Sequence, residues 1–218
     1  HNGRRRQRQM CIRDRLITKG FGDLLRIGYQ NRPLLFDLNI KLPELLYERV
    51  VEVSERLNEK GDVVTELNEE EVRNSLIKAK SDGINSVAIA FMHSYINPDH
   101  ENKIEKIAKE ENFNQISVSH KVSPLIKLVG RGDTTVVDAY LSPILRRYVN
   151  QVSEELKDTK STQLMFMQSN GGLTDANLFQ GKDALLSGPA GGVVSMTQTG
   201  KQAGFNKLIG FDMGGTST

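Results

Sequence analysis

The sequence predicts an α/β fold. From Leu16 onward, segments with the apolar spacing of helices alternate with short apolar runs that are typical of strands. Hydrophobic residues make up 38% of the chain and charged residues 26%, as in ordinary globular domains. The longest apolar run, Ser86 to Met92, is the size of one buried strand and too short to span a bilayer. We therefore expect one or two domains with a hydrophobic core, and no membrane partner.

In the first half of the chain, apolar spacing and capping residues predict two helices. Leu46, Val50, Val53 and Leu57 lie at helical spacing, which predicts a helix over 44–57. A turn over 59–62 and a short extended piece at Val63 and Val64 are expected next. Asn68 with Glu71 three residues later forms a capping-box pattern, which predicts a second helix that ends near Gly83.

The second half of the chain continues the alternation. Asn97 and Pro98 are typical of a helix start, and Pro143 predicts a kink in a long helix over 133–156. The further expected elements are strands over 84–93, 115–122, 162–169 and 207–213, a glycine turn over 170–172 and a helix from Pro189 to Gly204.

The basic excess of the chain comes from residues 1–15, which contain six arginines and one aspartate. Back-translated, Arg5 to Asp14 resembles a transposon-based sequencing adapter, so we interpret residues 1–15 as a non-native segment. Removing six of 29 basic and one of 27 acidic residues changes the net charge from +2 to −3. We therefore expect no nucleic-acid partner. The lone cysteine, Cys11, falls in the same segment, and a chain without cysteine fits a cytoplasmic location.

A strand-like run ending in GFDMGGTST (210–218) has the composition of a phosphate-binding loop. Gly214 and Gly215 would bring backbone N–H groups against a phosphate, and Thr216, Ser217 and Thr218 add hydroxyl donors. Asp212 would hold a Mg²⁺-bound water or orient the attacking group. The alternative is a plain hairpin turn, in which a glycine pair is common.

The context of that loop resembles a known family. SGPAGGV, a helix and then the strand into Asp212 are similar to the connecting helix and second phosphate loop of the actin-like ATPases. Seven ordered motifs resemble the hydantoinase A/5-oxoprolinase family, although KLVGRGDTT departs from the usual pattern and leaves Arg131 at the arginine position. The motifs are TKGFGDLLRIGYQNRPLLFDL, FMHSYINPDHE, SVSHKVSP, TTVVDAYLSP, MQSNGGL, LSGPAGGV and FDMGGTST.

The resemblance implies an actin-like (ribonuclease H-like) fold in which ATP and Mg²⁺ serve to open a cyclic amide. It implies an incomplete first domain over 16–205, with the hydantoinase A region starting near residue 116, and the start of a second domain over 206–218. It places Gly188, Gly191 and Gly192 near the nucleotide and Asp212 at the chemistry. It also implies a second subunit or fused hydantoinase B-type region, and an inactive fragment.

Two alternatives stay open at this point. One is the ATP-using subunit of an acetone or acetophenone carboxylase-type enzyme, which has similar motifs. The other is a non-catalytic actin-like binding protein.

Four further residues are candidates for contact with substrate or metal. His93, His100 and Glu101 lie where an expected strand passes into an expected helix. The alternative is structural: His93 closes the strand, and His100 and Glu101 occupy the first helical turn, where an acid suits the helix dipole. Asn170 precedes the Gly171-Gly172 pair and either faces a cleft or forms a plain turn.

Overall fold

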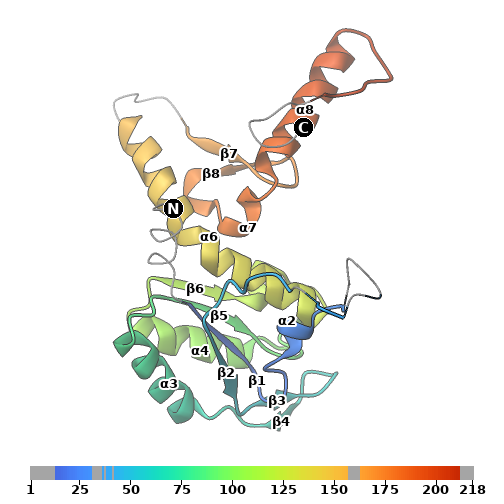
Figure 1. Cartoon of the computed structure of the whole chain (residues 1–218). Helices are drawn as coiled ribbons and strands as arrows, with labels where there is room; N and C mark the ends of the chain where they lie inside the picture. Colours follow the sequence, from blue (N-terminus) through green and yellow to red (C-terminus); the bar gives the residue numbers. More distant parts are fainter. Residues whose placement is uncertain (1–12, 31–35, 37, 41, 157–162, 212–218) are drawn as a thin grey trace. The chain divides into compact units, whose positions relative to one another are not determined.

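The structure, a computed structural model, describes residues 13–30, 36, 38–40, 42–156 and 163–211. The chain divides into two compact units, His1–Pro143 and Ile144–Thr218, and one long helix runs through the boundary (Figure 1). The predicted division into 1–15, 16–205 and 206–218 stays a prediction.

A four-stranded parallel sheet forms the centre of the first unit. Its order is β2-β1-β5-β6. Leu16 in the middle of β1 pairs with Val51 on one side and with Ile89 on the other. The strands are β1 (Arg13–Thr18), β2 (Arg49–Val53), β5 (Ser86–Ala90) and β6 (Gln115–Val118). The α/β prediction is confirmed.

Helices cover both faces of this sheet (Figure 1). Alternate strand residues point to opposite faces. Leu16 and Ile89 therefore pack in the cluster with α3 (Glu69–Ser81) and α4 (Asp99–Glu110). Their neighbours on the strands, Ile17 and the alanines of β5, pack on the opposite face against α2 (Leu24–Ile27) and the first part of α6 (Leu128–Glu155).

Local signals place the smaller elements of the first unit. Asn68 Oδ1 accepts a hydrogen bond from the Glu71 N–H at 3.1 Å, and Gly83 has a φ of +87°, so the capped helix α3 is confirmed. A two-stranded antiparallel pair precedes it. This pair consists of β3 (Arg56–Leu57) and β4 (Val63–Thr65).

The second unit contains a β-hairpin and two helices. Its elements are β7 (Met165–Met167), β8 (Leu173–Asp175), the short 3₁₀ helix η1 (Ala176–Leu178), α7 (Gly181–Ala184) and α8 (Ser187–Gln202). The predicted turn over 170–172 joins the two strands. In the described part of the chain, no helix combines the length and apolar character needed to cross a membrane.

The predicted helix over 44–57 is wrong, because this segment forms β2 and β3. Val50, Val51 and Val53 are β-branched and pair with β1, a contact distant in sequence that outweighs their helical spacing.

Three other boundaries differ from the predictions. The strand expected over 115–122 ends at Val118, where the helical turn α5 (Ser119–Val122) begins. The helix α6 starts earlier than expected because Leu128 packs under Ile17. Residues 207–211 of the expected last strand form no strand: Ile209 is 98% exposed, and no described strand pairs with it.

Candidate functional site at the carboxyl edge of the sheet

The strand order creates a switch point at the carboxyl edge of the first unit's sheet. From β1 the chain places its next parallel strand, β2, on one side and the following one, β5, on the other. In open α/β sheets, ligands bind outside the carboxyl ends of strands at such a point. The side chains that gather here are therefore the first candidates for function.

A buried carboxylate, Glu101, joins the ends of β5 and β6. Its Oε1 accepts hydrogen bonds from the Phe91 N–H at 2.9 Å and from the Ser119 hydroxyl at 2.6 Å. Its Oε2 accepts from the His120 N–H at 3.0 Å and lies 2.6 Å from His120 Nδ1. Glu101 is 0% exposed, so it anchors the first turn of α4 to both strand ends.

A buried arginine, Arg131, supports the same strand ends from α6. Its guanidinium donates to the Ser119 hydroxyl at 3.0 Å, to the Leu125 carbonyl at 2.5 Å and to the Phe91 carbonyl. Its Cζ lies 5.4 Å from the centre of the Tyr95 ring. Burial lowers the pKa of Arg131, and the charge of Glu101 opposes that shift. Arg131, the arginine of the unusual KLVGRGDTT segment, thus has a structural role: its hydrogen bonds hold the strand ends in place.

A second carboxylate–histidine pair lies at the end of β1. His100 Nδ1 is 2.8 Å from Glu55 Oε2, and the other Glu55 oxygen accepts from the Thr18 hydroxyl. The Thr18 oxygen in turn accepts from the Met92 N–H at 2.9 Å. His100 Nε2 is buried and has no partner among the residues that the structure describes.

His93 lies directly beyond β5 in a left-handed backbone conformation with a φ of 60°. Residues other than glycine adopt this conformation at a cost, and such strain clusters at functional sites. Its Nδ1 is buried and forms no hydrogen bond within the described ranges. The structure therefore brings His93, His100 and Glu101 to one edge of the sheet, with His100 and Glu101 held in the first helical turn as the structural alternative requires.

Sequence reasoning missed the partners of these residues. Glu55, Ser119 and Arg131 are far from residues 93–101 in sequence. Ser119 belongs to the SVSHKVSP motif and Arg131 to the KLVGRGDTT segment, whereas no motif contains Glu55. Across the described chain there is no group of three His, Cys, Asp or Glu side chains that would hold a metal ion.

The remaining candidate residues belong to the second unit. Asn170 Oδ1 accepts from the Gly172 N–H at 2.8 Å, so its side chain shapes the turn between β7 and β8. Gly188 is exposed, and no atom lies within 4 Å of the position that its Cβ would occupy. At Gly191 the nearest atom to that position is Met167 Cγ at 3.7 Å. Gly192 is exposed on the same helix, α8.

The predicted phosphate loop lies outside the described residues. This applies to Asp212, and to Gly214, Gly215, Thr216, Ser217 and Thr218. Their assigned roles toward ATP and Mg²⁺ therefore stay predictions.

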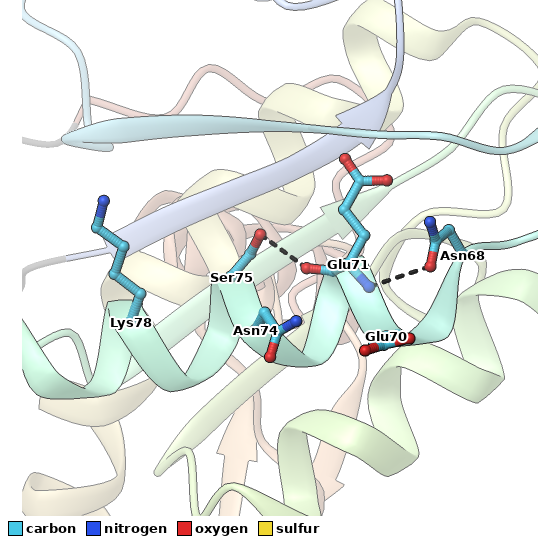
Figure 2. A pocket seen from close by; sticks show the side chains of 6 residues that line it. All are labelled: Asn68, Glu70, Glu71, Asn74, Ser75 and Lys78. Atoms are coloured by element: carbon cyan, nitrogen blue, oxygen red, sulfur yellow. Dashed lines mark hydrogen bonds between the residues drawn. The ribbon is translucent and has the colours of Figure 1, made fainter.

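One cavity of the first unit, of about 510 Å³, lies along the surface of α3 (Figure 2). Asn68, Ser75 and Lys78 are among its lining residues. Figure 2 shows that two of the hydrogen bonds here serve the helix itself: Asn68 caps the Glu71 N–H, and the Ser75 hydroxyl donates to the Glu71 carbonyl at 2.9 Å. We interpret this cavity as a solvated helix face.

Two family models match the chain. The hydantoinase/oxoprolinase N-terminal region matches residues 14–112, and the hydantoinase/oxoprolinase model matches residues 131–218.

Curated relatives include 5-oxoprolinase of Saccharomyces cerevisiae, which is 42% identical over 93% of this chain and 18% of the relative. The caprolactamase subunit alpha of Pseudomonas jessenii is 30% identical over 93% of this chain and 30% of the relative. The chain thus spans less than a third of the length of either.

Two solved structures resemble this one. The ATP-dependent caprolactamase from Pseudomonas jessenii superimposes with a TM-score of 0.80 at 27% identity, over 94% of this chain and 31% of that one. Nucleotide-free acetone carboxylase superimposes with a TM-score of 0.78 at 21% identity, over 93% and 31%. The likeness to acetone carboxylase shows that the two chains share a fold.

Proposed function

The chain belongs to the hydantoinase/oxoprolinase family, and from this premise we propose that it is part of an enzyme that opens a cyclic amide at the expense of ATP. The observation that carries the proposal is the 42% identity to a 5-oxoprolinase over 93% of the chain, supported by the likeness to an ATP-dependent caprolactamase.

The chemistry explains why ATP is needed. An unstrained lactam is a poor electrophile. Transfer of the γ-phosphoryl group from ATP to the carbonyl oxygen releases ADP and activates the carbonyl carbon. A first water adds to that carbon, the ring C–N bond breaks as the protonated amine leaves, and an acyl phosphate remains. A second water hydrolyses the acyl phosphate to the carboxylate and free phosphate. Such a transfer depends on positioning and on neutralising charge, tasks that we assign to Mg²⁺, to Asp212 and to the amides and hydroxyls of residues 214–218.

The start of α8 supports a nucleotide near the second unit. This helix of 16 residues begins at Ser187, and its N-cap residue provides no side-chain hydrogen bond to the first turn. The N–H groups of Ser187 and Gly188 are then available to an anion, since Pro189 has no N–H and the Ala190 N–H donates to the Leu186 carbonyl; the open surface at Gly188 permits close approach. We propose that Gly188, Gly191 and Gly192 border the phosphates of ATP.

The test uses the complete product of the source gene. We expect ATP hydrolysis that depends on 5-oxoproline or a hydantoin, with stoichiometric ring opening and a dependence on Mg²⁺. Asp212→Asn should lower kcat at least about a hundredfold. Turnover with acetone or acetophenone and bicarbonate would instead place the protein among the carboxylases. ATP binding without substrate-stimulated hydrolysis would identify a non-catalytic protein.

We also propose a cytoplasmic enzyme that works with a second subunit or a fused hydantoinase B-type region. A relative is itself named as a subunit alpha, which supports this. Co-purification with the product of a neighbouring gene, or a fused region in the complete reading frame, would test it.

A further inference from the structure

A second cavity of the first unit, of about 500 Å³, lies at the end of β1. It is formed by the segment after β1, the first of the seven family motifs, together with the edge strand β2. Its volume falls in the range of small-molecule sites, which is about 300–1,000 Å³. The buried polar cluster described above does not use these residues.

One wall of the cavity presents a fixed carboxylate, Glu52. Its Oε1 accepts hydrogen bonds from the N–H groups of Gly20 and Gly22, both at 2.9 Å. Gly20 has a φ of +91°, and a Cβ at Gly22 would lie 3.0 Å from Glu52 Oε1. Both positions therefore favour glycine, and the two amides hold the carboxylate in place. Glu52 Oε2 has no hydrogen-bond partner among the described residues, so it is available to a donor from a ligand.

The remaining lining residues are mostly apolar. Phe21 and the aliphatic side chains of Leu24, Ile27 and Val50 line the cavity, and Asp23 contributes a second carboxylate to it. A small apolar ring packs favourably against such a surface, while the few polar groups fix its orientation.

A guanidinium lies beside the cavity. Arg56 Cζ is 5.1 Å from the centre of the Phe21 ring, and its Nη2 donates to the Lys19 carbonyl at 2.8 Å. The same Nη2 is 3.8 Å from the position that a Gly20 Cβ would occupy. Arg56 forms no ion pair with any residue that the structure describes, so its charge is free to meet an anionic group.

We propose that this cavity binds the cyclic amide itself, and specifically a lactam that carries a carboxylate. The ring N–H donates to Glu52 Oε2, the ring methylenes pack on Phe21 and Val50, and the carboxylate pairs with Arg56. This inference rests on the proposed function, because it names where that enzyme recognises its substrate.

The test compares two ligands that differ in one group. 5-Oxoproline and 2-pyrrolidinone share the lactam ring, but only the first has a carboxylate. Binding to the complete gene product is measured by isothermal titration, and KM is measured in the ATP-coupled assay. Arg56→Met should weaken 5-oxoproline roughly tenfold or more, the loss expected for a charge-assisted hydrogen bond, and leave 2-pyrrolidinone unchanged. Glu52→Ala should weaken both ligands.

The matched control is Arg146→Met, which removes an exposed arginine of α6 by the same substitution and should change neither ligand. Equal losses for both ligands in Arg56→Met, unchanged affinities in Glu52→Ala, or no binding of 5-oxoproline to the unaltered protein would overturn the inference.

The two proposals fail in different ways. Lactam-dependent ATP hydrolysis with unaltered KM values in both variants would support the proposed enzymatic function and refute the cavity as the substrate-binding site. Lactam binding that depends on Glu52 and Arg56, without ATP hydrolysis, would support the cavity as the lactam-binding site and refute the proposed enzymatic function.

Discussion

Replacement of Arg15 by leucine is expected to stabilise this chain, although it removes a charged side chain from a central strand. Arg15 lies in β1 between two neighbouring strands and is 0% exposed. Its Nε and Nη1 have no partner in the described structure, while Nη2 donates to the Gly22 carbonyl and the guanidinium lies 4.5 Å from the centre of the Tyr47 ring. Burial lowers its pKa, as expected for a cation held away from water.

The size of the expected change in the free energy of unfolding follows from these contacts. Two buried donor nitrogens without a partner, Nε and Nη1, cost about 1–3 kcal/mol each, and more on a charged group. The hydrogen bond to Gly22 and the contact with Tyr47 return about 3 kcal/mol together. Leucine retains most of the apolar burial. We therefore expect a gain of about 2 kcal/mol in the free energy of unfolding, which raises Tm by about 4–8 °C for a chain of this size.

The same substitution on the neighbouring strand is the matched control. Arg49 on β2 is the register partner of Asp14 and contacts its carboxylate at 2.6 Å. Arg49→Leu leaves that carboxylate, whose side chain is 1% exposed, without its cation. We expect a loss of about 3 kcal/mol. Thermal melts followed by circular dichroism compare the two variants. An Arg15→Leu protein with an unchanged or lower Tm would refute the reasoning.

Three more predictions concern single residues. Glu101→Gln should lower stability by about 3 kcal/mol, because an amide cannot accept all the hydrogen bonds that the carboxylate accepts; an unchanged urea midpoint would contradict it. Burial raises the pKa of Glu105, but hydrogen bonds from Lys109 and Lys121 outweigh it and hold that pKa below 4.5. The stabilisation by Glu105 is thus complete above pH 4.5 and lost as pH falls through the lowered value, so Glu105→Gln should flatten the acid limb of a stability–pH curve. Gly20→Ala should cost about 1 kcal/mol because of its positive φ, and equal melting temperatures would exclude this strain.

Local sequence patterns predict helices that have strong capping residues. They fail where pairing between strands distant in sequence determines the secondary structure. The Asn68 cap and the glycine at 83 defined α3 without help from the rest of the chain. Val50 and Val53 are three residues apart, a helical spacing, and in the sheet they lie on opposite faces; their pairing with β1 selects the strand. The sequence does not predict β1, because Arg13 to Arg15 fall in the segment that we interpret as non-native. An arginine with unpaired donors at a buried strand position fits that assignment, whose origin in adapter DNA stays a prediction.

The candidate site likewise contains residues that local sequence patterns predict and residues that only contacts distant in sequence bring together. His93, His100 and Glu101 were found because they lie close together in sequence. Their partners were not, since no sequence pattern connects Glu55 with His100 across 45 residues. The Glu52 cavity was missed for a similar reason. Its glycines belong to the TKGFGDLLRIGYQNRPLLFDL motif, but the carboxylate that gives them a role comes from another strand.

Burial separates the residues that frame the first unit from those that can meet a ligand. Glu101 and Arg131 are 0% exposed, and their hydrogen bonds run to backbone and hydroxyl groups of the strand ends. They act on any ligand only through the positions of those strand ends. Glu52 is exposed, and its Oε2 has no partner among the residues that the structure describes. A loss of activity in a Glu101 variant should therefore accompany a lower Tm, whereas Glu52→Ala should raise KM at a nearly unchanged Tm. A lower kcat in Glu101→Gln with an unchanged Tm would instead indicate that Glu101 takes part directly in catalysis.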